Sequence, residues 1–186
     1  MTHSTVIGFS GNIARPSKTF AFVDHIVREV ARTTGLAGYT YDIEDFGPSL
    51  PHARRAADLD AQARVIMERI VDADLLVVGT PTYKGSYTGL FKHVFDLLEP
   101  IALRGKPVVL TATGGGDRHA LVAEHALRPL FGFFEALSVP TAIYATDRDF
   151  ADGRIMNEAV LHRVAQAVNQ ATNALRMTDN FSLAAE

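Results

Sequence analysis

Apolar residues follow two different patterns along this chain, and the two patterns alternate. Short runs of mostly apolar, often β-branched residues occupy positions 5–9, 39–43, 75–79, 107–112 and 139–145. Runs of this length and composition predict strands, and the nearly continuous ones are typical of strands buried on both faces of a parallel sheet. The pattern therefore predicts five strands.

Longer stretches between the runs place apolar residues three or four positions apart, which is the spacing of one helix face. These stretches cover residues 20–30, 59–72, 90–98, 119–137 and 157–176. Ser17 or Thr19 is expected to cap the first helix, and Gly35 and Gly38 to end it. Residues 44–58, which contain Gly47 and two prolines, are typical of a loop.

Strands and helices that alternate in this way predict an α/β fold in which a doubly wound parallel sheet lies between two layers of helices. We expect the strand order 2-1-3-4-5, because this order places the first, third and fourth strands side by side. The loops that follow those strands then meet at one edge of the sheet. Residues 1–176 are predicted to form a single domain, and the tail at 177–186 is expected to be mobile.

Composition narrows the classes of function. The 186 residues carry a net charge of −3 without a basic cluster, so nucleic acid and membrane surfaces are not expected partners. The absence of cysteine excludes disulfide and thiol chemistry. The chain shows neither a leader pattern nor an apolar run long enough for a bilayer, and the cytoplasm is the expected location.

The loop after the first strand is rich in groups that bind phosphate. It lies before a helix N-terminus, where free backbone N–H groups and the helix dipole favour an anion. A capped helix with a polar turn is the alternative interpretation. The spacing matches neither G-x-x-x-x-G-K-[ST] nor G-x-G-x-x-G. The candidate donors are Ser10, Asn12, Arg15, Ser17, Lys18 and Thr19.

Two further loops, at residues 80–87 and 113–117, follow the third and fourth strands. Proline fixes the backbone of the first loop, and its tyrosines offer flat faces, while glycines in the second allow a close backbone approach. Ordinary surface turns are the alternative. Together with the phosphate loop, they point to a mononucleotide with a flat ring, a flavin. The candidate residues are Pro81, Thr82, Tyr83, Lys84, Thr113, Gly114, Gly115 and Gly116.

Other polar residues give weaker signals. Asp117 and Arg118 adjoin the glycines, and Arg118 is a candidate for attracting the phosphates of a nicotinamide cofactor. A charge cluster at a helix start explains the same residues equally well. The seven histidines do not show the paired spacing of metal ligands, so no metal site is expected.

The stretch at 119–137 contains an irregularity. Leu121 and Val122 are one position out of phase with the apolar face, and Pro129 lacks the N–H that would bond to the carbonyl of His125. A one-residue insertion that forms a π-bulge around His125 accounts for both facts, and a plain helix kinked by the proline is the alternative. Three phenylalanines at 131–134 cannot all face one side, so aromatic surface is expected to be exposed or buried between subunits.

The segments TPTYKGSYTG at 80–89, ATGGG at 112–116 and EHALRP at 124–129 resemble the NAD(P)H-dependent FMN reductases of the flavodoxin-like superfamily. The likeness spans roughly residues 6–176 and is strongest to reductase components of alkanesulfonate and methanesulfonate monooxygenase systems. The family favours the compact motif G-S-x-R-x-x-S, whereas here Ser10 precedes Gly11 and Arg15 lies further on.

The resemblance implies where FMN binds and what the protein does. The phosphate would contact Ser10, Arg15, Ser17, Lys18 and Thr19, and the isoalloxazine would lie between residues 81–83 and 113–116. NADPH or NADH would reduce free FMN, and reduced flavin would pass to a partner monooxygenase. Homodimers or homotetramers are implied, as is a helix insertion near a subunit interface in relatives that release their flavin.

Two alternatives remain open from the sequence. The first is a quinone, azo or chromate reductase with a fixed FMN. The second is a non-enzymatic, flavodoxin-like electron carrier, although such carriers are usually strongly acidic and this chain is not. No catalytic acid or base is expected, because the flavin itself carries the hydride.

Overall fold

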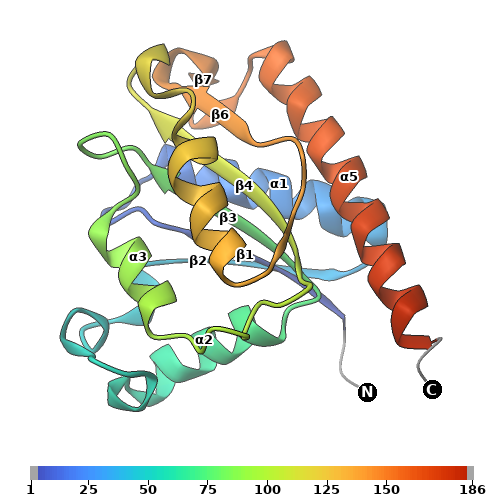
Figure 1. Cartoon of the computed structure of the whole chain (residues 1–186). Helices are drawn as coiled ribbons and strands as arrows, with labels where there is room; N and C mark the ends of the chain where they lie inside the picture. Colours follow the sequence, from blue (N-terminus) through green and yellow to red (C-terminus); the bar gives the residue numbers. More distant parts are fainter. Residues whose placement is uncertain (1–3, 184–186) are drawn as a thin grey trace.

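The computed structural model describes residues 4–183, with side chains described up to Met177. Its main sheet is parallel and has the strand order β2-β1-β3-β4-β5, with β6 also paired to β4 (Figure 1). The predicted fold class and strand order are therefore confirmed. The strands are β1 (Thr5–Ser10), β2 (Ala37–Asp42), β3 (Leu75–Pro81), β4 (Pro107–Gly114), β5 (Leu137–Ser138) and β6 (Ile143–Thr146).

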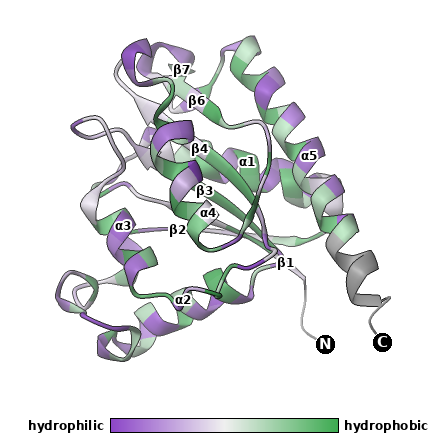
Figure 2. Ribbon diagram, in the orientation of Figure 1, coloured by the Kyte–Doolittle hydropathy of each residue, from purple (hydrophilic) through white to green (hydrophobic). Residues whose placement is uncertain are grey.

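Helices cover both faces of the sheet. One face packs against α1 (Lys18–Thr34) and α5 (Glu158–Leu183), and the other against α2 (Ala61–Asp72), α3 (Gly89–Asp96) and α4 (Arg128–Phe133). Both faces of β3 are buried, with Leu76 on one side and Val77 on the other, which explains its continuous apolar run. Figure 2 shows the hydrophobic strands between helices whose outer faces are hydrophilic.

An aromatic cluster fixes α3 and α4 against the sheet. Phe9 of β1 stacks on Phe91 of α3, with ring centroids 5.5 Å apart, and Phe95 contacts Phe131 of α4 edge to face. Each of these rings is almost fully buried, and burying such a side chain stabilises the fold by about 1.5–3 kcal/mol. The cluster therefore holds the strand-end loops next to these helices in place.

The predicted fifth strand is a strand only in its second half, as β6, and the two-residue β5 precedes the predicted range. Residues 139–145 were expected to be continuous, but β5 ends at Ser138 and β6 begins at Ile143. Pro140 lies between them, and it has no N–H to continue the ladder after Val139 donates to Val108. A small hairpin of β7 (Phe150–Ala151) and β8 (Arg154–Ile155), which the pattern does not predict, follows β6.

Other element ends also differ from the expectation. The last helix runs to Leu183, seven residues past the predicted end at 176, and residues 184–186 lie outside the described part. The mobility of the tail stays a prediction. Segment 44–58 is irregular, as expected, but it contains three 3₁₀ turns, η1 (Glu44–Phe46), η2 (Leu50–His52) and η3 (Ala56–Asp58). No helix among the described residues is long and apolar enough to cross a membrane.

The predicted π-bulge around His125 is confirmed. Residues Ala123–Leu127 form a π-helix, η5, in which the N–H of Arg128 bonds to the carbonyl of Ala123, five residues earlier. The single helix expected over 119–137 is instead a 3₁₀ turn, η4 (Asp117–His119), followed by η5 and α4, which ends at Phe133. Phe134 is buried in the core, whereas Phe133 is 65% exposed and packs edge to face on Phe134, with ring centroids 5.2 Å apart.

Candidate functional site

The carboxyl ends of β1, β3 and β4 meet at one edge of the sheet, as predicted. Hydrogen bonds join their loops: Gly11 N donates to the carbonyl of Gly79, and Thr82 N to the carbonyl of Thr113. The loops enclose a cavity of about 410 Å³, within the size range of ligand pockets. It is lined by Asn12, Ala14, Pro16, Ser17, Lys18, Thr19, Pro81, Thr82, Tyr83, Thr113, Gly114, Gly115 and Asp147.

The N-terminus of α1 forms one end of this cavity. The Ser17 side chain caps the helix by accepting from the N–H of Phe20, and the first turn holds no acidic residue. The first N–H groups of a helix have no partner inside it, and they carry the positive end of its dipole. Thr19 of the same turn is tied to Thr113 by a buried hydrogen bond of 2.6 Å between their hydroxyl groups. This end suits a phosphate group.

Lys18 is the cation nearest to that helix end, and it is already paired. Its Nζ lies 2.7 Å from Oδ1 of Asp147, and both side chains are about half or more exposed. Asp147 comes directly after β6 and was not among the predicted site residues. It could have been found, because β6 ends at the same edge of the sheet as the other strands.

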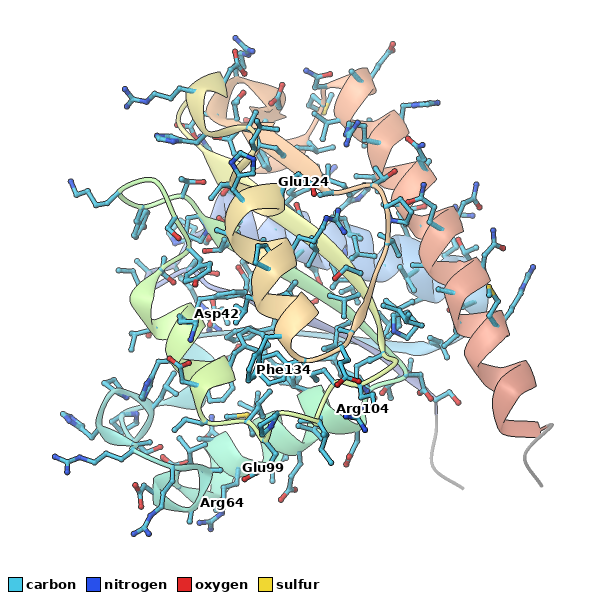
Figure 3. The ribbon with its side chains drawn as sticks, viewed as in Figure 1. Asp42, Arg64, Glu99, Arg104, Glu124 and Phe134 are labelled. Carbon is cyan, nitrogen blue, oxygen red and sulfur yellow. The ribbon has the colours of Figure 1, made fainter. Side chains whose placement is uncertain are left out.

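Arg15 does not line the cavity. Its guanidinium forms two hydrogen bonds to Asp42, of 2.7 and 2.6 Å, and an ion pair of 2.7 Å to Asp45. Asp42, at the end of β2, is completely buried (Figure 3). Burial by itself would raise the pKa of Asp42, but the hydrogen bonds from Arg15 and Asn12 outweigh it and lower that pKa. The positive charge of Arg15 is therefore neutralised within the protein.

Ser10 and Asn12 belong to the same network. The Ser10 hydroxyl donates to Oδ1 of Asn12 at 2.6 Å, and the Asn12 amide donates to Asp42 at 2.9 Å and to the carbonyl of Ala14 at 3.2 Å. Ser10 is buried below the cavity, and Asn12 reaches its wall. These residues, together with Arg15 and Asp42, fix the shape of the loop from beneath.

The β3 loop forms a second wall. Tyr83 and Ser86 exchange backbone hydrogen bonds across a tight turn, in which Lys84 and Gly85 both have positive φ angles, of 52° and 87°. Such a turn favours glycine at Gly85. It holds Tyr83 beside the cavity with its ring 48% exposed, while Lys84 points elsewhere. Thr82 Oγ1 is buried without a hydrogen-bond partner among the described residues, so a ligand atom could satisfy it.

The glycine loop after β4 forms the opposite wall. A Cβ placed on Gly114 would lie 2.2 Å from the hydroxyl of Tyr144, which donates to the carbonyl of Gly116 at 2.8 Å. The chain therefore needs glycine at this position for close packing. Gly114 and Gly115 line the cavity, whereas Gly116 does not. The cavity thus combines three features: a helix N-terminus without an acid in its first turn, the Thr82 hydroxyl without a partner, and a wall of glycines. Together they fit a phosphate joined to a flat ring.

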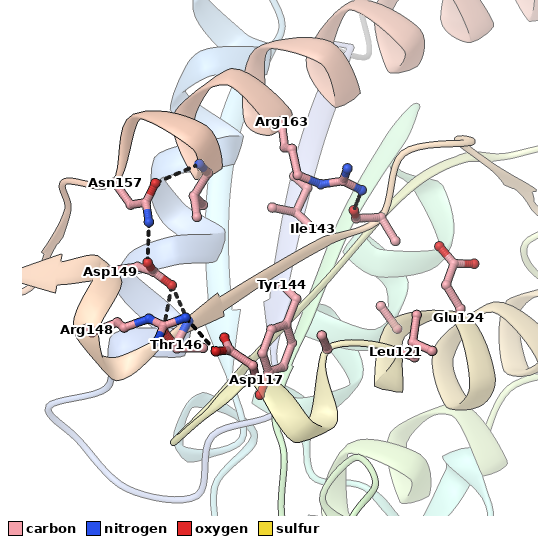
Figure 4. Close-up of a pocket in the computed structure, with 14 residues that line it drawn as sticks. Asp117, Leu121, Glu124, Ile143, Tyr144, Thr146, Arg148, Asp149, Asn157 and Arg163 are labelled. Atoms are coloured by element: carbon pink, nitrogen blue, oxygen red, sulfur yellow. Dashed lines mark hydrogen bonds and ion pairs between the residues drawn. The ribbon is translucent and has the colours of Figure 1, made fainter.

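The segment beyond the glycines faces two other cavities. Asp117 is turned to Arg148, with 2.6 Å between their charged atoms, and both line a cavity of about 400 Å³ next to β6 (Figure 4). Arg118 lies instead beside a cavity of about 320 Å³ that His125 also lines. The structure therefore separates the two residues that the sequence had grouped as contacts for a nicotinamide cofactor.

Known proteins share this architecture. A model of the family described as NADPH-dependent FMN reductase matches residues 4–151. The chain is 40% identical over 166 residues to a protein of Pseudomonas fluorescens named NADH-dependent FMN reductase SfnF, covering 89% of each. It is 38% identical to an FMN reductase (NADPH) of Pseudomonas aeruginosa, also covering 89% of each.

Solved structures agree. An oxidoreductase from Corynebacterium diphtheriae superposes with a TM-score of 0.84 at 31% identity, covering 95% of this chain and 99% of that one. An NADH:FMN oxidoreductase named EmoB superposes with a TM-score of 0.74 at 28% identity, covering 94% and 89%. The resemblance seen in the sequence is thus confirmed. The chain belongs to the NADPH-dependent FMN reductase family and is an oxidoreductase that uses FMN and a nicotinamide nucleotide.

Proposed function

We propose that the cavity enclosed by the three loops is the FMN site. The phosphate would bind at the N-terminus of α1, beside Ser17, Lys18 and Thr19, and the ring would lie between Tyr83 and the glycine loop. The observation that carries this assignment is the single cavity of about 410 Å³ that joins the N-terminus of α1, whose first turn holds no acidic residue, to a glycine wall. Asn12 and Pro81 would complete its lining.

The bound flavin would supply the redox chemistry, because it accepts a hydride from the nicotinamide. The protein's own residues bind and orient the reactants. Thr82 offers a hydroxyl without a partner, Gly114 allows a close backbone approach, and Tyr83 forms a flat wall.

We also propose that FMN exchanges with solution as a substrate. The phosphate would meet few cations, because Arg15 is neutralised by Asp42 and Asp45, and Lys18 is shared with Asp147. Charge-assisted bonds are the strong contacts to phosphate, so a site with few of them favours release. The π-helix supports this interpretation, since the sequence resemblance links such an insertion to relatives that release their flavin.

Reduced FMN would then reach a partner monooxygenase, by analogy with the sulfonate systems whose reductases the sequence resembles. We place this activity in the cytoplasm, where NAD(P)H is available. A groove of about 690 Å³ between α3 and α4, beside the exposed Phe133, supports assembly into a homodimer or homotetramer. Sedimentation of Phe133→Ser beside the unaltered protein tests this assembly, which predicts a smaller species for the variant.

The test of the function is anaerobic NADPH and NADH oxidation by flavin-free protein at several FMN concentrations. Turnover that saturates with free FMN is expected if flavin is a substrate. Tightly held FMN that turns over only when a quinone is added would instead favour a reductase with a fixed flavin. Failure of either nucleotide to reduce the flavin would favour an electron carrier.

A further inference from the structure

A second cavity is lined by two of the loops that line the candidate FMN site, but by other residues of them. It has a volume of about 320 Å³ and is lined by Gly85 and Ser86 of the β3 loop and by Arg118, His119 and His125 after β4. The FMN cavity is lined by residues 81–83 and 113–115, which precede these on the same two loops and are separated from them by one and by two residues. The two cavities are therefore consecutive along the same pair of loops.

The basic side chains at this second cavity have no partner within the described part of the chain. Arg118, His119 and His125 form neither an ion pair nor a side-chain hydrogen bond there, and the same holds for Lys84, next to Gly85. Most other exposed cations of the described chain are paired, as Arg28 is with Asp24. The charge of Arg118 at the cavity, and that of Lys84 beside it, is therefore not neutralised by an acid of the described chain.

The nearest acids in the sequence are engaged elsewhere. Asp117 pairs with Arg148, with which it lines the cavity shown in Figure 4. Glu124 accepts a hydrogen bond of 3.0 Å from Arg128, and this bond is the main cause that lowers the pKa of Glu124. Both acids are thus paired with other cations, and no acidic residue lines the cavity.

The π-helix contributes to this arrangement. Glu124 and His125 are consecutive in η5, and the first contacts Arg128 while the second lines the cavity. Single π-turns within helices occur often at functional sites. A cavity that carries Arg118 and lies on the same two loops as the candidate flavin site suits an anionic part of the molecule that reacts there.

We propose that this cavity binds a phosphate group of the nicotinamide co-substrate. The inference rests on the proposed FMN site, because the nicotinamide must reach a ring that lies beside Tyr83. Arginine binds phosphate through parallel charge-assisted hydrogen bonds, and the two imidazoles add further donors. The phosphate belongs either to the pyrophosphate of NADH and NADPH or to the 2′-phosphate that only NADPH carries.

The test compares Arg118→Gln and His125→Gln with Arg54→Gln, an exposed arginine that also lacks an ion pair among the described residues. Calorimetry on flavin-free protein measures the binding of adenosine 2′,5′-bisphosphate and of ADP. Kinetics at saturating FMN give kcat/KM for NADPH and for NADH. We expect the first two variants to lose about tenfold in affinity and in kcat/KM, the change that 1.4 kcal/mol produces, and Arg54→Gln to lose neither.

Weaker binding of both fragments would assign the cavity to the pyrophosphate, and weaker binding of the bisphosphate alone would assign it to the 2′-phosphate. Equal affinities in Arg118→Gln, His125→Gln and Arg54→Gln would overturn the proposal, as would no binding of either fragment to the unaltered protein. The fragments bind without flavin or turnover. An unaltered protein that binds them but cannot reduce FMN would therefore contradict the proposed function alone.

Discussion

The loop after β1 and the segment after β4 both border the candidate FMN site. They differ in whether their arginine is paired with an acid of the protein. In the first, Arg15 pairs with the buried Asp42 and with Asp45. In the second, Arg118 has no partner among the described residues, because Asp117 is turned to Arg148. The first loop is thus held in shape by charges inside the protein. In the second, the charge of Arg118 can pair with a negative group of a bound ligand.

The largest expected effect comes from removing the centre of the first network. Asp42→Ala takes away a fully buried carboxylate that accepts bonds from Arg15 and Asn12. We expect the free energy of unfolding to fall by about 2–3 kcal/mol, less than for a fully buried pair, because Arg15 remains half exposed. Urea unfolding measures this, with Glu29→Ala as the control for a surface pair with Arg32. Equal losses in the two variants would contradict the comparison.

FMN binding by the same variant decides how Arg15 acts. If Arg15 only positions the loop through Asp42, Arg15→Ala, Asp42→Ala and the double variant should weaken FMN binding by similar amounts. If Arg15 contacts the phosphate, as the sequence resemblance implied, Arg15→Ala should weaken binding, while Asp42→Ala frees the guanidinium and does not. Titration of flavin fluorescence separates these outcomes.

Lowering the pH should remove the stabilisation that the Asp42 network gives to the folded protein. Burial opposes the charge on Asp42, but its hydrogen bonds lower the folded-state pKa below the value of about 3.9 expected for unfolded Asp. The stabilisation is therefore complete above that unfolded value and is lost as the pH falls through the lower folded pKa. Unfolding measured between pH 7 and pH 2 should show a steeper loss in the unaltered protein than in Asp42→Asn. Parallel curves would show that Asp42 carries no such linkage.

Sequence reasoning predicted the features that depend on residues close together in the chain. The alternating runs predict the α/β fold, and we expect the order 2-1-3-4-5 because it brings the three loops to one edge of the sheet. The π-helix follows from Leu121 and Val122 lying out of phase and from Pro129. The partner of Arg15 could not be read in the same way. Asp42 is 27 residues away, and it meets the loop only because the parallel register places it beside Ser10. Asp147 reaches Lys18 across a separation of 129 residues.

A smaller loss of stability is expected from a substitution in the glycine wall, which is held by close packing rather than by ion pairs. In Gly114→Ala the new methyl group would meet the hydroxyl of Tyr144, and overpacking of this kind costs about 1–3 kcal/mol. FMN affinity should fall with it. Removing the obstructing hydroxyl by adding Tyr144→Phe should restore both stability and affinity. Gly116→Ala is the matched control, because a Cβ there meets no atom within 4 Å.

If Tyr144→Phe fails to rescue Gly114→Ala, the added methyl group acts on the ligand directly rather than through the tyrosine. The wall would then be a contact surface, and its glycine would be required by the flavin. A loss in Gly116→Ala as large as that in Gly114→Ala would show instead that backbone freedom, and not the clash with Tyr144, limits the loop.

The smallest effect is expected from breaking the exposed ion pair between Lys18 and Asp147 at the phosphate end of the cavity. Exposed pairs contribute about 0–1 kcal/mol, so Asp147→Asn should leave unfolding almost unchanged. It should nevertheless tighten FMN binding about two- to threefold at low salt, because Lys18 loses its competing carboxylate, and screening should remove the gain as salt rises. Asp96→Asn, which breaks the exposed pair with Lys92, is the control. Weaker FMN binding in Asp147→Asn would mean that Asp147 orients Lys18 toward the phosphate. Both cations near the phosphate end, Arg15 and Lys18, would then need their paired acid for the site to bind FMN.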